Sequence, residues 1–207
     1  MKYLRSNKGF TLVELAIVLV IIGIILGAVL KGQELIYNAK VKRVQSQIKE
    51  FISAFYTYYD KYGYYPGDDP TASTKFSPGA PNGNGNGLVE GGYCDTTFEE
   101  SCYLWRHLRY ANIISGDPAV STPANLLPKH PFGGPVHMFT GTYTVGGTPR
   151  SGLWITLRNI EAQAAAAIDR AMDDGRCTTG SIARYDGTAC NNNDYPTSGY
   201  LDIWMNF

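Results

Sequence analysis

The first 65 residues contain no proline, and residues 10–30 contain a single charged side chain, that of Glu14. Proline breaks a helix because it lacks a backbone N–H and clashes with the preceding turn. Gly63 is a natural residue to end a helix, since glycine adopts the backbone conformation that a helix stop requires. With nothing earlier to interrupt it, the sequence predicts one nearly continuous helix from about Phe10 to Tyr62.

The sequence also lacks the residue arrangements that carry catalysis. No pair of histidines has metal-ligand spacing, no G-x-S-x-G motif is present, and no glycine-rich phosphate loop precedes a helix. We therefore expect neither enzymatic activity nor a cofactor. From residue 63 onward the chain holds nine basic and fourteen acidic side chains and no dense basic face, which argues against a nucleic-acid partner. The scattered histidines are His107, His130 and His137.

A long apolar run stands near the N-terminus. Among the 21 residues from 10 to 30, only Thr11 and Glu14 are polar. A helix rises ~1.5 Å per residue, so this run spans roughly 30 Å, the thickness of one bilayer core. A secretory signal peptide is shorter and ends in small residues at a cleavage site, whereas Lys31 follows this run. Three basic residues and no acid precede it, which predicts a cytoplasmic N-terminus with the remainder outside.

Glu14 is the unusual residue of this run, because a carboxylate in hydrocarbon costs on the order of 3 kcal/mol or more. One interpretation is that Glu14 lies near the interface and reaches the lipid headgroups. The other joins it to Gly9, which ends a short basic leader, and to the aromatic Phe10. In that interpretation the acid has a partner or a function.

The stretch "KGFTLVELAIVLVIIGIILGAVL" closely resembles the N-terminus of type IV pilins and of the related type II secretion pseudopilins. The resemblance implies that prepilin peptidase cuts between Gly9 and Phe10 and that the new amino group of Phe10 is N-methylated. It also implies that Glu14 neutralises the terminal ammonium of a neighbouring subunit during assembly. The Glu14 carboxylate lies one helical turn from the N-terminus and can pair with that ammonium. Pairing stabilises the contact, since unpaired charges are costly in an apolar interface.

The resemblance implies the pilin fold, an α+β architecture. In it a long N-terminal helix, transmembrane and then amphipathic, packs on an antiparallel sheet of about four strands, with extra short helices and loops. Four segments are expected along the chain. They are a leader peptide (residues 1–9), a transmembrane and assembly helix (10–30), an amphipathic stem helix (31–62) and a globular head (63–207).

The leading functional hypothesis is a structural subunit of a type IV pilus-like filament. Its implied partners are further copies of itself and other pilins, prepilin peptidase, an inner-membrane assembly platform and, before assembly, the membrane. The precursor would lie in the inner membrane with a cytoplasmic N-terminus and a periplasmic head, and then join an extracellular filament on the cell surface. The alternatives are a type II secretion pseudopilin, which extends a short periplasmic piston, and a membrane-anchored periplasmic binding domain that never polymerises.

Beyond Lys31 the apolar pattern changes from continuous to striped. Apolar residues recur at steps of three and four, which is the period of one helical face, so the stem is expected to lie on the head. Residues 31–62 also hold six basic and three acidic side chains, so a basic stem carries an acidic head. The stripe comprises Val41, Val44, Ile48, Phe51, Phe55, Tyr59 and Tyr62.

The head is expected to combine helices with strands. Alternating apolar residues predict the strands, a three-to-four-residue period predicts the helices, and stretches rich in Gly, Pro, Asn and Asp predict loops at 64–92 and 119–135. The expected helices cover residues 98–114 and 161–175, and the expected strands cover 136–145, 152–160, 180–186 and 199–207.

The chain has four cysteines, an even number on its exported side, which predicts two disulfides. Three connectivities are possible, and nearness in sequence favours Cys94 with Cys102 and Cys177 with Cys190. The competing interpretation is a zinc site, but no C-x-x-C pair exists and no histidine lies near the second pair. The later pair resembles the disulfide-bonded loop that borders many pilin heads.

Part of a calcium-loop pattern occurs in the first loop of the head. Asn82, Asn84, Asn86 and Glu90 place oxygens at every second residue, with a glycine at the turn. Asparagine replaces aspartate at all three early positions, and the bidentate acid expected near Tyr93 is missing. The alternative is a plain series of Gly-Asn turns without a metal.

Overall fold

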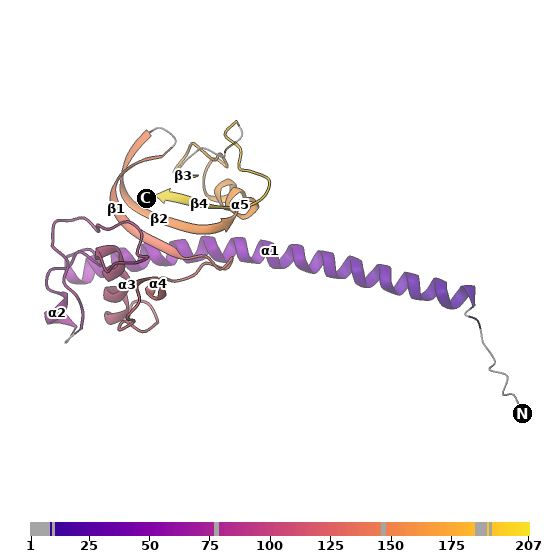
Figure 1. The fold of residues 1–207 in the computed structure, drawn as a ribbon, viewed down its shortest axis with the longest axis horizontal. Coiled ribbons are helices and arrows are strands. Elements are labelled where there is room, and N and C mark those ends of the chain that lie inside the picture. Colours follow the sequence, from indigo (N-terminus) through magenta and orange to yellow (C-terminus); the bar gives the residue numbers. More distant parts are fainter. Residues whose placement is uncertain (1–8, 10, 77–78, 146–147, 185–189, 191) are drawn as a thin grey trace, which may run out of the picture. The chain divides into compact units, whose positions relative to one another are not determined.

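The structure, a computed structural model, describes residue 9 and residues 11–76, 79–145, 148–184, 190 and 192–207 (Figure 1). The predicted leader, apart from Gly9, and Phe10 lie outside the described residues. The chain divides into two compact units, one ending at Ala39 and the other beginning at Lys40. This boundary falls inside the first helix, so the two parts of that helix are described separately.

Helix α1 covers Leu12–Tyr62, which confirms the prediction of one long N-terminal helix. Up to Leu30 its side chains are almost all apolar and all exposed. By length and composition this helix could cross a membrane. It ends where Gly63 takes a positive φ of 78° and donates its N–H to the carbonyl of Tyr59, 2.8 Å away.

The second part of α1 presents one buried face, as the stripe predicts. The prediction was wrong at its end, because Tyr58 is fully buried while Tyr59 is 44 % exposed. After Phe55 the next buried residue of the stripe is Tyr58, three positions further on, rather than Tyr59, four positions further on. Steps of three and four then alternate, and their average spacing is about 3.5 residues per turn. The buried residues are Val41, Val44, Ile48, Phe51, Ala54, Phe55 and Tyr58.

A four-stranded antiparallel sheet forms the other main part of the head, in the order β1-β2-β4-β3. Its strands are β1 (Val136–Val145), β2 (Thr148–Glu161), β3 (Ile182–Arg184) and β4 (Tyr200–Asn206). The sheet and the long helix confirm the predicted α+β, pilin-like layout. A register shift in β2 between Leu157 and Ile160 accompanies a left-handed Asn159, whose N–H bonds the Asp202 carboxylate at 2.8 Å.

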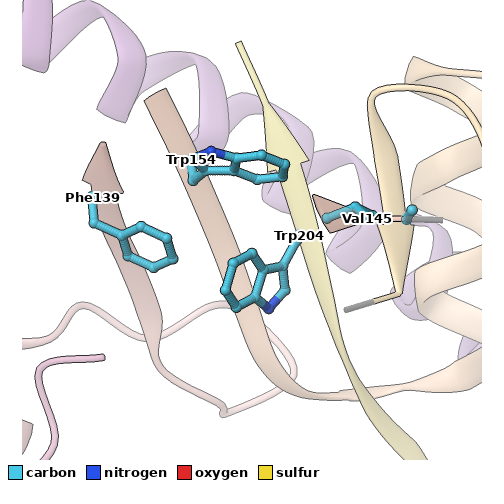
Figure 2. Close-up of a cluster of buried hydrophobic side chains, with 5 residues drawn as sticks. Phe139, Val145, Trp154 and Trp204 are labelled. Carbon is cyan, nitrogen blue, oxygen red and sulfur yellow. The ribbon is translucent and has the colours of Figure 1, made fainter. Parts of the chain in front are cut away.

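One face of the sheet carries an aromatic cluster (Figure 2). Phe139, Trp154 and Trp204 come from β1, β2 and β4, and each is at least 96 % buried. The two indole rings meet edge-on with their centroids 5.7 Å apart, an arrangement that aromatic pairs prefer. Val145 and Ala183 complete the cluster. This face therefore has its own core, separate from the stem.

The opposite face of the sheet is turned to the stem helix. Leu153 of β2 and Thr140 of β1 line the same pocket as Phe55 of α1. The helix also packs on α3 (Glu100–Tyr110), where Phe51 meets Trp105 edge-on with ring centroids 5.1 Å apart. Burying a large apolar side chain contributes about 1.5–3 kcal/mol, so this ridge holds the second part of α1 on the head.

The helices of the head differ from the expected ones at their ends. Helix α5 covers Ala162–Met172, within the predicted range, whereas α3 stops at Tyr110 instead of continuing to residue 114. Two short helices, α2 (Ala72–Lys75) and α4 (Pro123–Leu126), occupy stretches that were expected to be loops. In α4 proline stands at the first helical position, which suits its fixed φ and missing N–H.

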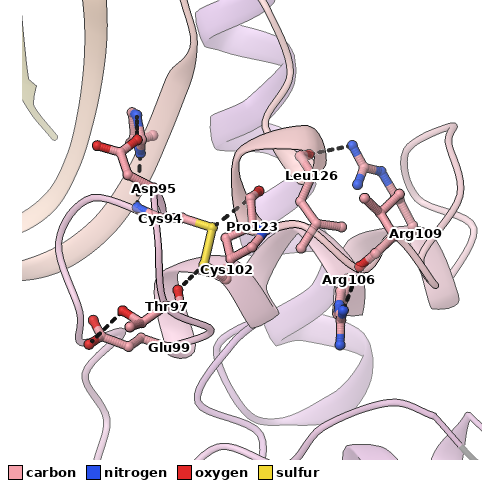
Figure 3. Close-up of a disulfide and its surroundings, with 11 residues drawn as sticks. Cys94, Asp95, Thr97, Glu99, Cys102, Arg106, Arg109, Pro123 and Leu126 are labelled. Atoms are coloured by element: carbon pink, nitrogen blue, oxygen red, sulfur yellow. Dashed lines mark hydrogen bonds and ion pairs between the residues drawn. A yellow bond between two sulfur atoms is a disulfide. The ribbon is translucent and has the colours of Figure 1, made fainter.

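Two disulfides join the four cysteines. Cys94 pairs with Cys102 and Cys177 pairs with Cys190, the pairing that nearness in sequence favours. Figure 3 shows the first bridge fastening the segment before α3 to the first turns of that helix. The second closes a loop that contains β3.

Candidate processing and assembly site

Thr11 and Glu14 form a reciprocal cap at the N-terminal end of α1. The Glu14 carboxylate accepts hydrogen bonds from the Thr11 backbone N–H and hydroxyl, both at 2.8 Å. In return, the Glu14 N–H donates to the Thr11 hydroxyl oxygen at 3.2 Å. This is a capping box, and it supplies partners to N–H groups that the first turn of a helix leaves unpaired.

The predicted role of Glu14 did not include Thr11. The signal was present, because threonine followed three residues later by glutamate before an apolar run is the sequence signature of a capping box. Such a cap contributes about 1 kcal/mol to a helix. The box also fixes the rotamer of Glu14, so its carboxylate stays at the N-terminal end of the helix, where the helix dipole favours an anion.

The expected cleavage point lies immediately before this cap. Gly9 is exposed, and a Cβ added to it would meet nothing within 4 Å. A cut after Gly9 would leave the new amino group on Phe10, which precedes Thr11 in the chain. Both bonds to Glu14 use Oε2, and among the described residues nothing donates to Oε1. The carboxylate therefore keeps an acceptor for a terminal ammonium.

Each histidine of the head bonds to the backbone of a neighbouring segment. His107 accepts the Gly67 N–H at Nδ1 (2.9 Å) and donates from Nε2 to the Pro81 carbonyl (2.7 Å). His130 accepts the N–H of Phe132, and His137 accepts the N–H of Cys94. Burial lowers the pKa of His107 and of His137 to about 4, so both act as neutral packing residues.

The structure brings together three of the four residues of the calcium-loop pattern. The amide groups of Asn84 and Asn86 both donate to Oε2 of Glu90, at 2.9 and 3.2 Å. Their side-chain oxygens accept backbone N–H groups two residues further on, while Asn82 instead accepts the N–H of Ser73. In this arrangement the amide oxygens belong to turns, and calcium binding at this loop stays a prediction.

Two acids that the calcium-loop pattern does not include organise this loop. The buried Asp68 carboxylate accepts the N–H groups of Asn86 and Gly87 at 3.0 and 2.9 Å. Glu100 accepts the N–H groups of Asn84 and Glu90. The loop therefore folds around two carboxylates that bind backbone donors, which explains why so polar a segment is ordered.

Within the described residues, three carboxylates also meet at the end of α5. Ligand atoms of Asp169, Asp173 and Asp174 lie within 4.8 Å of one another, a spacing that could hold a cation. Each already accepts hydrogen bonds, among them one from Tyr195 to Asp169 at 2.7 Å. Burial, together with the neighbouring carboxylates, raises the pKa of Asp169 to about 6.

Comparison with known proteins concerns the N-terminal segment. A family model described as the prokaryotic N-terminal methylation motif matches residues 4–30, the segment that contains the capped end of α1. No curated protein and no solved structure matches the chain significantly. The match points to a structural protein rather than an enzyme. The chain thus carries at residues 4–30 the N-terminal methylation motif that is the hallmark of the type IV prepilin and pseudopilin superfamily.

Proposed function

We propose that this chain is a structural subunit of a type IV pilus-like filament. It is made as a precursor in the inner membrane with its head in the periplasm, and prepilin peptidase removes residues 1–9. The amino group of Phe10 is then methylated, and the chain joins an extracellular filament through an inner-membrane assembly platform. In the mature subunit, residues 10–30 form the assembly helix, 31–62 the stem and 63–207 the head.

The observation that carries this proposal is the position of Glu14. Thr11 holds this carboxylate at the start of an exposed apolar helix. Thr11 directly follows Phe10, whose amino group would carry a positive charge after cleavage. A fixed anion at that point is costly in lipid unless a positive charge meets it. The ammonium of a neighbouring subunit would supply that charge and set the register of the two helices.

The exposed side chains of α1 up to Leu30 provide the driving force for this step. An apolar helix leaving the lipid must bury its surface elsewhere, at about 25 cal/mol per Å² of apolar area removed from water. Bundling with the same helix of other subunits meets this need. The same geometry would serve a pseudopilin, so filament length, and not this site, separates a surface pilus from a periplasmic piston.

Two substitutions at the capped end test the proposal. Glu14→Gln removes the charge but keeps a side chain that can complete a capping box, whereas Thr11→Val removes the cap and keeps the charge. We expect Glu14→Gln to lower the yield of sheared surface fibres at least about tenfold, because the ammonium then lacks its partner. Thr11→Val should lower it less, and both chains should still be cleaved after Gly9.

The readouts are electron microscopy and immunoblotting of sheared cells, with membrane fractions to show the processed chain. Long fibres from the unaltered chain would favour a pilus over a secretion piston. Fibres at undiminished yield from Glu14→Gln would refute the assembly role of the carboxylate.

A further inference from the structure

A groove of about 820 Å³ runs along the second part of α1, inside the unit that begins at Lys40. One wall is the helix itself, and the other is formed by the end of α3 with the segments that follow it. Its apolar lining includes Phe51 and Ala54 from the helix and Ile113 and Ile114 from the opposite wall. Apolar side chains flanked by polar ones are the usual composition of a protein interface.

The charged lining of this groove is mostly basic. It contains Arg43, Lys49 and Arg109 against one acid, Glu50. Glu50 is already satisfied, because it accepts hydrogen bonds from Arg43 at 2.5 Å and from Ser46 at 2.9 Å. Among the described residues that line the groove, no further acid faces Lys49 and Arg109, and Arg109 feels the charge of Asp117 outside the groove.

The walls also carry hydrogen-bonding atoms without a partner. Arg109 donates from one nitrogen to the Leu126 carbonyl at 2.6 Å, but its Nε and Nη1 have no acceptor among the described residues. Gln47 donates to the Lys129 carbonyl at 3.0 Å, and its Oε1 lacks a donor in the same part of the chain. These atoms are themselves buried, so the free charge that the groove offers to a partner is that of the exposed Lys49.

We propose that this groove receives an acidic surface of the head of a second copy of this chain. The proposal rests on the filament function proposed above and names the contact between subunits that the heads would make. The head carries nine basic and fourteen acidic side chains, so the charge opposite to that of the groove is present on the same chain. When two different surfaces of one chain fit each other, the contact repeats from copy to copy and builds an open polymer.

A zero-length crosslinking experiment tests this contact directly. Cells expressing the full chain are transferred from unlabelled to heavy-nitrogen medium during expression, so that membranes and later fibres contain both forms. Sheared fibres and membranes are then treated with a carbodiimide, which joins a lysine to a carboxylate in contact with it. We expect mixed-isotope peptides linking Lys49 to a carboxylate within residues 63–207. Links from Lys49 within one copy only, or none, would overturn the proposal.

Charge reversal gives the second readout. Lys49→Glu should lower fibre yield at least about fivefold, because each subunit then places like charges in contact. Lys42→Glu is the matched control, since Lys42 is exposed two turns earlier on the same side of α1 and does not line the groove. Its fibre yield should stay within about twofold of the unaltered chain.

The outcomes separate the two proposals. Equal yields from Lys49→Glu and the unaltered chain, without Lys49 crosslinks between copies, would overturn the groove contact and leave the filament function standing. Equal losses from Lys42→Glu and Lys49→Glu would show that diffuse stem charge, rather than the groove, is responsible, and would also overturn it. An unaltered chain that forms no filament would overturn both proposals.

Discussion

At the scale of single residues, buried polar groups join the stem to the loop that follows it. The Tyr58 hydroxyl donates to the buried Asp69 carboxylate at 2.8 Å, and Lys75 pairs with the same carboxylate at 2.7 Å. Burial opposes ionisation of Asp69, but the hydrogen bonds from Lys75, Thr71 and Tyr58 outweigh it and hold the pKa of Asp69 below its ordinary value. The ring of His107 stacks on that of Tyr58, with centroids 5.9 Å apart.

The buried His107 makes the stability of the head depend on pH. Its pKa is lowered to about 4 by burial, whereas an unfolded histidine titrates near about 6.5. Between these values the unfolded chain binds more protons, so the free energy of unfolding should fall as the pH decreases from about 6.5 to 4, by up to roughly 3 kcal/mol. Urea unfolding of the full chain in detergent measures this fall.

A variant isolates the contribution of this histidine. His107→Gln can still donate to the Pro81 carbonyl but does not titrate, so its stability should fall less steeply with acid than that of the unaltered chain. His137 has a similarly lowered pKa, so part of the fall should persist. Parallel pH curves for the two proteins would contradict the role assigned to His107.

At the scale of elements, sequence patterns predicted most of the helices and strands but not where each one ends. The strand at 136–145 was predicted as it is found, because a proline precedes it and two glycines follow it in the sequence. Helix α3 ends early because Asn112 takes a left-handed φ of 55° and the Ile113 N–H bonds the Leu108 carbonyl, which is a Schellman stop. Asparagine adopts this conformation only in some contexts, so its sequence position alone did not reveal the stop.

In the candidate site, too, local patterns predicted some residues and missed others. Gly9, Phe10 and Glu14 were named from a local pattern, and their roles in cleavage and assembly stay predictions. The grouping of Asp68 and Glu100 around one loop depends on contacts between residues far apart in sequence. Such contacts are set by packing of whole elements, and no local pattern encodes them.

The position of the buried face of α1 can be tested with adjacent tyrosines. Tyr58→Ala should lower the free energy of unfolding by about 3–5 kcal/mol, because it empties a fully buried site and leaves Asp69 without one donor. Tyr59→Ala, at a side chain that is 44 % exposed, should cost less than about 1 kcal/mol. Urea unfolding measures the loss in free energy of unfolding for each variant. Equal losses would show that the helix is rotated relative to the buried face described above.

At the scale of the whole molecule, charge and apolar surface are unevenly distributed along the chain, as the proposed filament function requires. The apolar part of α1 is exposed, the stem from residue 31 to 62 is basic, and the head is acidic. Under the proposed function, these surfaces would meet their partners on other copies of the chain. The N-terminal methylation motif at residues 4–30 agrees with this distribution.

Mass spectrometry of the N-terminal peptide from sheared surface fibres measures cleavage and methylation together. We expect a chain that begins at Phe10 and carries one methyl group on its amino nitrogen, with Glu14 unmodified. A fibre chain that still contains residues 1–9, or surface fibres from which this chain is missing, would contradict this expectation.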